Sequence, residues 1–170
     1  MHDLPISKIL AQYETDKVNG HTYGESYDDI FSNFDRNAPL DIIEIGTQKG
    51  GSLKAWRDYF PNATVTGIDI IDVVKPEYRD PSINYVVSDV KDYKPDREFD
   101  IVIDDGSHFL EDVLYTVDTF KLKKGGVMVI EDTQDPNEWS RAVRDATDYE
   151  MKTRDLRGAY DNFLIALWNY

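Results

Sequence analysis

The sequence predicts an α/β protein with a mostly parallel central sheet, because strand-like and helix-like segments alternate along most of its length. Five short apolar segments have the strand pattern, at residues 41–46, 64–70, 83–89, 99–105 and 126–132. Several of them are nearly continuous apolar runs, which is typical of strands that are covered on both faces. Strands that alternate with helices favour a parallel sheet with right-handed crossovers.

Helical periods lie between these strands. Leu53, Trp56 and Phe60 recur at helical spacing, and Pro61 ends that pattern. A second period covers 110–120, and the stretch "KLKKGG" that follows it has the lysines and glycines of a helix C-terminus with a left-handed cap. Asp135-Pro136 predicts the start of another helix.

The two ends of the chain complete the predicted fold. Ahead of the first strand, aromatic and apolar residues repeat at helical spacing from Tyr27 to Phe34. The segments 149–156 and 161–170 are predicted to be two strands of a closing hairpin. We therefore expect one domain over 1–170, with an N-terminal helical segment (1–38), a core (39–135), and a last helix with closing strands (136–170).

Composition excludes several classes of protein. With 19 Lys and Arg against 33 Asp and Glu, the formal charge is −14, which disfavours partners such as nucleic acids and anionic membranes. The chain has no cysteine, so disulfides, thiolate metal sites and a cysteine nucleophile are excluded. The start lacks the pattern of a signal peptide, and no apolar run approaches the roughly 20 residues of a membrane span. We expect a cytoplasmic protein; a homo-oligomer stays open.

A glycine-rich loop, "EIGTQKGGS", follows the first strand. Its glycines suit a tight turn and the close approach of a ligand to a helix N-terminus. Gln48 stands where a dinucleotide fingerprint has its second glycine, so NAD is disfavoured. Carboxylates follow at successive strand ends, namely Glu44, Asp69 and Asp89, and this set suits a neutral or cationic nucleoside.

Four segments resemble a known enzyme family: "YETDKVNGHTYGESYDDIF" (13–31), "IIEIGTQKGGSLKAWRDYFPNATVTGIDI" (42–70), "FDIVIDDGSHFLEDV" (99–113) and "GGVMVIEDTQ" (125–134). They resemble class I S-adenosylmethionine-dependent methyltransferases. More closely, they resemble the metal-dependent sugar O-methyltransferases of the macrocin and mycinamicin group, with the related cephalosporin hydroxylase family. The resemblance implies a three-layer Rossmann-like fold whose seven-stranded sheet has adjacent fourth and fifth strands and an antiparallel last strand.

By motif position, the resemblance implies S-adenosylmethionine binding by Glu44, Gly46, Asp69 and Asp89, and the prediction includes their neighbours Thr47, Ile70 and Val90. It also implies that "TDK" (15–17), with His21 and Tyr23, closes over the cofactor or acceptor. Lys17 either pairs with the cofactor carboxylate or is a surface lysine. Asp104 either faces the amino-acid part of the cofactor or positions its loop.

The resemblance further implies a magnesium site made by Asp105, Glu131 and Asp132, with His108 as the general base. If "IDD" and "IED" end neighbouring strands, these carboxylates converge and repel one another unless one is protonated or a cation lies between them. Hard oxygen ligands favour Mg²⁺, leave Ca²⁺ or Mn²⁺ open, and disfavour zinc. His108, expected on the first turn of the next helix, is alternatively a fourth ligand or a residue without a special role.

These residues predict an S-adenosylmethionine-dependent, Mg²⁺-assisted O-methyltransferase for a small-molecule hydroxyl, on a sugar or another vicinal diol or catechol. The chain is much shorter than the macrolide enzymes, so we do not expect the acceptor pocket to carry over with the motifs. Acceptor-binding residues are expected in the N-terminal segment and in the 133–140 and 157–162 loops. A nucleoside-binding module without turnover and an NAD-dependent oxidoreductase are the alternatives.

Overall fold

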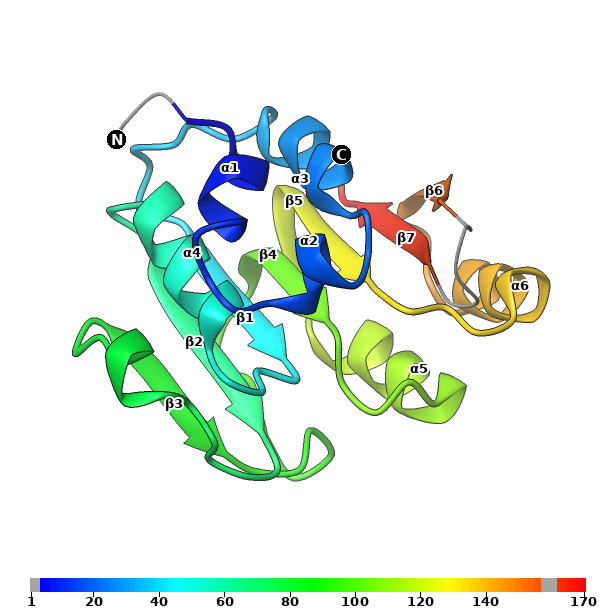
Figure 1. The fold of residues 1–170 in the computed structure, drawn as a ribbon. Coiled ribbons are helices and arrows are strands. Elements are labelled where there is room, and N and C mark those ends of the chain that lie inside the picture. The colour runs from blue at the N-terminus through cyan, green and yellow to red at the C-terminus, as the bar shows by residue number, and fades with distance from the viewer. Residues whose placement is uncertain (1–3, 157–161) are drawn as a thin grey trace.

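The computed structural model, which describes residues 4–156 and 162–170, is built on a seven-stranded sheet (Figure 1). The strand order is β3-β2-β1-β4-β5-β7-β6. Neighbours among β1 to β5 are parallel, whereas β7 runs antiparallel to both β5 and β6. The strands are β1 (Asp41–Ile45), β2 (Thr64–Asp69), β3 (Ile83–Val87), β4 (Phe99–Asp104), β5 (Leu122–Ile130), β6 (Glu150–Asp155) and β7 (Phe163–Trp168). The predicted sheet, its adjacent fourth and fifth strands and its closing hairpin are confirmed.

Helices cover both faces of the sheet (Figure 1). On one face lie α1 (Ile6–Leu10), α2 (Asp16–Asn19), α3 (Gly24–Phe31) and α4 (Gly51–Tyr59), and on the other lie α5 (Leu110–Thr119) and α6 (Pro136–Ala146). Helices do not separate every pair of strands. Only a short 3₁₀ turn, η1 (Pro76–Tyr78), connects β2 to β3, and a loop connects β3 to β4.

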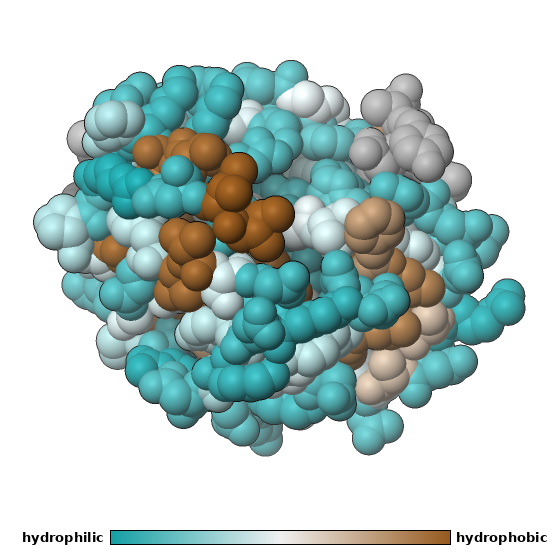
Figure 2. All heavy atoms as spheres, turned by 90° about the horizontal axis from the view of Figure 1, so that it is seen from below, coloured by the Kyte–Doolittle hydropathy of each residue, from teal (hydrophilic) through white to brown (hydrophobic). Residues whose placement is uncertain are grey.

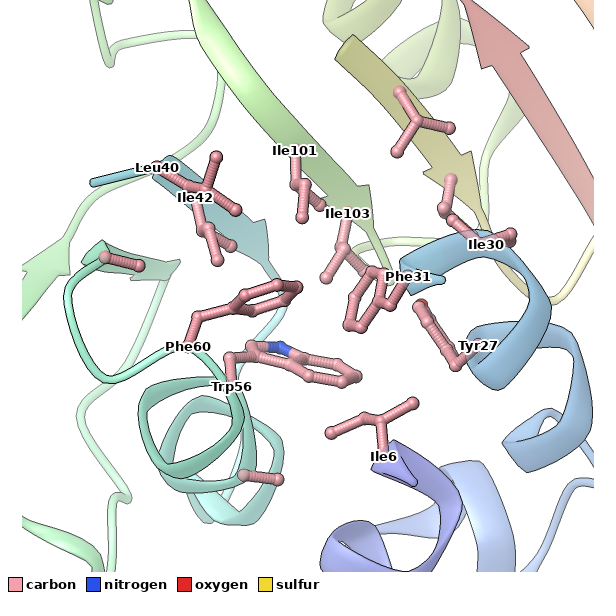
Figure 3. Packing of buried hydrophobic residues seen from close by; sticks show 14 of the residues in the cluster. Ile6, Tyr27, Ile30, Phe31, Leu40, Ile42, Trp56, Phe60, Ile101 and Ile103 are labelled. Carbon is pink, nitrogen blue, oxygen red and sulfur yellow. The ribbon is translucent and has the colours of Figure 1, made fainter. Parts of the chain in front are cut away.

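The core consists of two apolar layers because successive residues of each strand point to opposite faces. Ile42 of β1 joins Trp56 and Phe31 on the face of α1, α3 and α4, where aromatic rings pack edge to face or tilted (Figure 3). Its neighbour Ile43 points to the other layer, with Trp139 of α6. These layers fix the ends of the parallel strands relative to one another.

The sequence prediction of a helix end over the lysine- and glycine-rich stretch 121–126 is wrong, because residues 122–126 belong to β5. Helix α5 stops at Thr119, and Leu122 pairs with Phe99 of β4 and is buried. The left-handed backbone expected here occurs at Gly125, but its N–H donates to the carbonyl of Asn169. Pairing and burial of Leu122 therefore decide the conformation over the helix-capping pattern.

The predicted start of α6 is confirmed. The Asp135 carboxylate accepts hydrogen bonds from the backbone N–H groups of Asn137 and Glu138, at 3.1 and 3.0 Å. Within the described ranges, every helix is too short or too polar to cross a bilayer.

Candidate active site

Carboxylates converge where three neighbouring strands end. Glu44 is near the end of β1, Asp104 ends β4 and Asp105 follows it, and Glu131 and Asp132 follow β5. Because β4 lies between β1 and β5, and all three strands are parallel, these groups share one edge of the sheet. The strand pairing that the resemblance implied therefore brings the two acidic motifs together.

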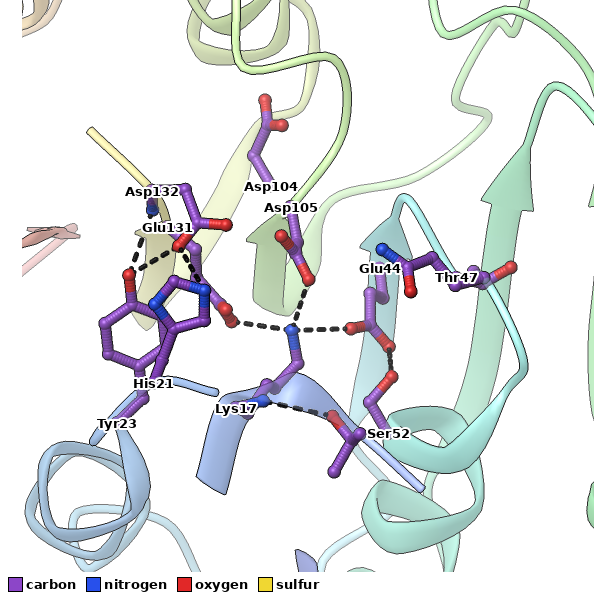
Figure 4. A network of polar contacts seen from close by, with 12 residues as sticks. Lys17, His21, Tyr23, Glu44, Thr47, Ser52, Asp104, Asp105, Glu131 and Asp132 are labelled. Carbon is purple, nitrogen blue, oxygen red and sulfur yellow. Dashed lines mark hydrogen bonds and ion pairs between the residues drawn. The ribbon is translucent and has the colours of Figure 1, made fainter. Parts of the chain in front are cut away.

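Lys17 of α2 lies at the centre of this edge (Figure 4). Its Nζ is 3.2 Å from Glu44 Oε1, 2.7 Å from Asp105 Oδ2 and 2.8 Å from Glu131 Oε1. The side chain is 1% exposed, so the alternative of a surface lysine is wrong. We call Lys17, Glu44 and Glu131 the lysine cluster; Asp105 links it to the second group, described next.

The second group, which we call the rim cluster, consists of Asp105, His108 and Asp132. One oxygen or nitrogen from each lies within 4.8 Å of the others, a spacing that allows a shared metal ion. His108 Nε2 is 3.4 Å from both Asp105 Oδ1 and Asp132 Oδ2, and its side chain is partly exposed. The cluster is therefore compact and open to solvent on one side.

His108 is not on the first turn of α5, as the sequence suggested. It has a φ of 57° in the loop before α5, and Phe109 is the N-cap residue of the helix. Asp132 has a φ of 52°. Left-handed backbone is uncommon for residues other than glycine, and such strain is concentrated at functional sites.

The N-terminal segment supplies further donors to the strand ends. The Tyr27 hydroxyl donates to Glu131, and the Tyr23 hydroxyl donates to Asp132 Oδ1 at 2.5 Å. Burial, followed by the nearby carboxylates, raises the pKa of both tyrosines, so both stay protonated donors. His21 stacks on Tyr23, and its Nε2 is 3.5 Å from Asp132 Oδ1.

Negative charge is in excess at this edge. No lysine or arginine other than Lys17, among the residues described, pairs with Glu44, Asp105, Glu131 or Asp132. Burial raises the pKa of Glu44, Glu131 and Asp132. Burial also opposes ionisation of Asp105, but the charge of Lys17 and the hydrogen bond with His108 hold its pKa below the usual value. A proton or a divalent cation would relieve the excess charge.

A cavity of about 240 Å³ lies beside the rim cluster, and Asp105, a member of that cluster, also lines the cavity. Five of the predicted cofactor residues line it: Gly46, Asp69, Ile70, Asp89 and Val90. Gly46, with a φ of 82°, is required here because a Cβ would lie 2.0 Å from the carbonyl oxygen of Asp105. The Asp69 carboxylate accepts the N–H groups of Thr47 and Gln48, both at 2.9 Å, and so shapes the glycine-rich loop.

The other four predicted cofactor residues do not line this cavity. Glu44 Oε2 accepts hydrogen bonds from Ser52 and Trp56 in the buried layer, Lys17 is enclosed by carboxylates, and Thr47 is buried. The Asp104 side chain points away from Lys17 (Figure 4), and its Oδ1 accepts the Gly106 N–H at 3.3 Å. Burial raises the Asp104 pKa to about 6. These contacts favour the loop-positioning alternative for Asp104.

Large apolar side chains are exposed around the strand ends. Figure 2, seen from the side on which β1, β2 and β4 end, shows apolar patches on a mostly polar surface. The large apolar residues with exposed side chains include Ile70, Ile71, Val73, Val87 and Phe109. Ile70 lines the cavity and Phe109 follows His108, so the site has an apolar border.

Tyr27 contacts this site although the sequence did not predict it. Its apolar spacing with Ile30 and Phe31 indicated a core helix, and its ring is indeed buried in that layer. The available signal was a second tyrosine four residues earlier, at Tyr23, which places two hydroxyls on one side of the segment.

Comparisons with known proteins point to one group of enzymes. No protein-family model matches the chain. It is 35% identical over 149 residues to 8-demethyl-8-alpha-L-rhamnosyl tetracenomycin-C 2'-O-methyltransferase of Streptomyces olivaceus, a match that covers 78% of this chain and 39% of that protein. It is 32% identical over 147 residues to mycinamicin VI 2''-O-methyltransferase of Micromonospora griseorubida, covering 75% and 35%.

A solved structure agrees. The MycE methyltransferase of the mycinamycin pathway, in complex with Mg and SAH, superposes with a TM-score of 0.68 and 25% identity, over 98% of this chain and 53% of that one. The chain spans little more than a third of the length of these two curated relatives. Sequence and fold together confirm the resemblance: the chain is related to the macrocin and mycinamicin group of sugar O-methyltransferases and has the class I methyltransferase fold.

Proposed function

We propose that the chain carries the cofactor- and metal-binding core of an S-adenosylmethionine-dependent, Mg²⁺-assisted O-methyltransferase. The acceptor is a hydroxyl of a small molecule, on a sugar or another vicinal diol or catechol. The observation that carries the proposal is the rim cluster beside the Gly46 cavity, because it joins a nucleoside-sized space to two carboxylates and an imidazole. Relatives that are named sugar O-methyltransferases support it.

The residues present fit both groups. Gly46, Asp69 and Asp89 would hold the nucleoside of S-adenosylmethionine, which when bound supplies a methyl group on its sulfonium sulfur. Asp105 and Asp132 would hold the divalent cation, which supplies positive charge that lowers the pKa of a nearby hydroxyl. The all-oxygen carboxylate set favours Mg²⁺, and Mn²⁺ or Ca²⁺ would also suit it. Glu131, predicted as a third ligand, contacts Lys17 and Tyr27 instead.

His108 is the proposed general base. It would accept the hydroxyl proton on its imidazole ring, whose Nε2 lies 3.4 Å from Asp105 Oδ1 and from Asp132 Oδ2. The imidazolium would then lie beside Asp105 and Asp132, whose negative charge it would share with the divalent cation. The hydrogen bond with Asp105, followed by these charges, raises the His108 pKa above its ordinary value against the opposing effect of burial. The apolar border at Ile70 and Phe109 would cover the reacting groups from water.

The test is S-adenosylhomocysteine formation from S-adenosylmethionine on a panel of sugar diols and catechols, with Mg²⁺ or with EDTA. We expect turnover that EDTA abolishes and that His108→Ala lowers by roughly 10²- to 10⁴-fold. Glu111→Ala, an exposed change on the first turn of α5, is the matched control and should retain activity. Full activity of His108→Ala, or turnover that is insensitive to EDTA, would contradict these assignments.

Two alternatives make different predictions for the same protein. A binding module would bind S-adenosylmethionine without forming product on any acceptor. An NAD-dependent oxidoreductase would bind NADH more tightly than S-adenosylmethionine, and the Gln48 side chain at the glycine-rich loop disfavours it. A competition titration with the two ligands separates these cases.

A further inference from the structure

Lys17 has a place in the site that the proposed reaction does not use. It is a fully buried ammonium that contacts three carboxylates at the ends of three different strands, at 2.7 to 3.2 Å. Helix α2 holds it there, since the Thr15 side chain accepts the Lys17 backbone N–H and the helix is followed at once by His21 and Tyr23, which reach Asp132. The N-terminal segment thus carries a fixed positive charge into the strand ends.

Asp105 is shared between this charge and the proposed cation site. Its Oδ2 contacts Lys17 Nζ, and its Oδ1 faces His108 in the rim cluster. A divalent cation on Oδ1 would therefore lie on the same carboxylate as the ammonium. Like charges at such a separation repel strongly inside a protein, where the effective dielectric constant is far below that of water.

Glu131 is also engaged by Lys17. Its Oε1 is 2.8 Å from Lys17 Nζ and accepts the Tyr27 hydroxyl, and the residue is 2% exposed. It would have to leave the ammonium to serve as a third ligand in the rim cluster. Lys17 therefore reduces the negative charge at the proposed cation site and the number of carboxylates that are free to bind a cation there.

We propose that Lys17 is a positioning residue that weakens divalent-cation binding by competing for Asp105 and Glu131. This inference rests on the cation site of the proposed function. The consequence is an exchangeable cation, held weakly by the protein alone and more firmly when an acceptor diol adds its own oxygen atoms. The competing charge is the Lys17 ammonium, which the folded chain itself holds next to Asp105 and Glu131.

The test is a Mn²⁺ titration of the whole chain, followed by the electron paramagnetic resonance signal of free Mn²⁺, without cofactor or acceptor. Lys17→Met should bind Mn²⁺ at least tenfold more tightly than the wild type. Lys17→Arg, which keeps the charge, should stay within about threefold. Lys54→Met is the matched control, because it removes a lysine that is paired with two carboxylates, Asp58 and Asp80, away from the site. It should leave the affinity unchanged.

A folded Lys17→Met variant whose Mn²⁺ affinity equals or falls below that of the wild type would overturn the inference. If Lys17→Met does not fold, Glu131→Gln decides, since the amide can still accept the Tyr27 hydroxyl. If the Mn²⁺ affinity of Glu131→Gln stays within threefold of the wild type, Glu131 is the partner of Lys17 and the inference is supported. If the variant loses tenfold or more in Mn²⁺ affinity, Glu131 is a cation ligand, and the competition of Lys17 for Glu131 is refuted. If folded wild type and folded Lys17→Met both fail to bind millimolar Mn²⁺, the cation site of the proposed function fails as well.

Discussion

Asp105 of the rim cluster contacts the lysine cluster through Lys17, but the two clusters differ in how their charges are balanced. In the lysine cluster, a buried ammonium is surrounded by carboxylates. Tyr27 donates to Glu131 Oε1, which Lys17 also contacts, and Ser52 and Trp56 donate to Glu44 Oε2. In the rim cluster, two carboxylates face a partly exposed imidazole, and the backbone is left-handed at two positions. From this difference we expect the first cluster to hold the strand ends together and the second to take part in the proposed chemistry.

Removing the buried ammonium should give the largest loss of stability. Lys17→Met leaves Glu44 and Glu131 buried without their cation, and breaking a buried pair in this way costs about 3–5 kcal/mol. His108→Ala should cost less than about 1 kcal/mol, because its side chain is partly exposed and its contacts are long. Urea unfolding followed by circular dichroism in EDTA measures both, with Lys54→Met as the surface control. Equal losses for Lys17→Met and His108→Ala would remove the distinction between the clusters.

Substitution of the two tyrosines, Tyr27 and Tyr23, should distinguish the lysine cluster from the rim cluster through smaller losses of stability. Tyr27→Phe takes a donor from Glu131, so we expect a loss of about 1–3 kcal/mol in the free energy of unfolding. Tyr23→Phe takes a donor from Asp132 in the rim cluster, so methyl transfer should change in addition to stability. Tyr170→Phe, at an exposed hydroxyl near Lys152, is the control for both. A Tyr27→Phe variant that loses activity without losing stability would place Glu131 in the reaction.

Much of this fold could be predicted from the sequence because it depends on local patterns. Apolar runs marked the strands at 41–46 and 99–105, and Asp135-Pro136 marked the start of α6. The stretch 121–126 could not be assigned correctly, since the burial of Leu122 and its pairing with Phe99 come from the tertiary structure. The absence of an α-helix before and after β3 could not be predicted either, because no local pattern contradicted the expected alternation of strands and helices.

The site was predictable only in part for a related reason. Motif positions identified the carboxylates at the strand ends, and the strand order brings those of β4 and β5 together. Which carboxylate contacts Lys17 depends on where α2 lies, and a four-residue helix leaves little trace in the sequence. The roles of His108 and Glu131 stay predictions. The expected acceptor loop at 157–162 lies, except for Asn162, outside the described residues.

The smallest expected effect is a pH dependence of stability that belongs to the rim cluster alone. The hydrogen bond with Asp105, with the charges of Asp132, Asp105 and Asp104, raises the His108 pKa above its ordinary value in the folded state, although burial opposes the shift. A raised histidine pKa contributes stability that is complete below about pH 6.5, the unfolded value, and is lost as the pH rises through the folded value. In EDTA, the free energy of unfolding should therefore fall over this range in the wild type.

His108→Gln removes the titrating group and should flatten that fall, while an exposed change such as Glu111→Ala should leave it unchanged. Mg²⁺ should also reduce the slope, because a cation that binds Asp105 and Asp132 takes over the charge that the imidazolium balances. Unfolding midpoints measured between pH 6 and 9, with and without Mg²⁺, give both comparisons. A slope that persists in His108→Gln would mean that the titration belongs to the lysine cluster or another group, and that His108 does not interact with the rim carboxylates in solution.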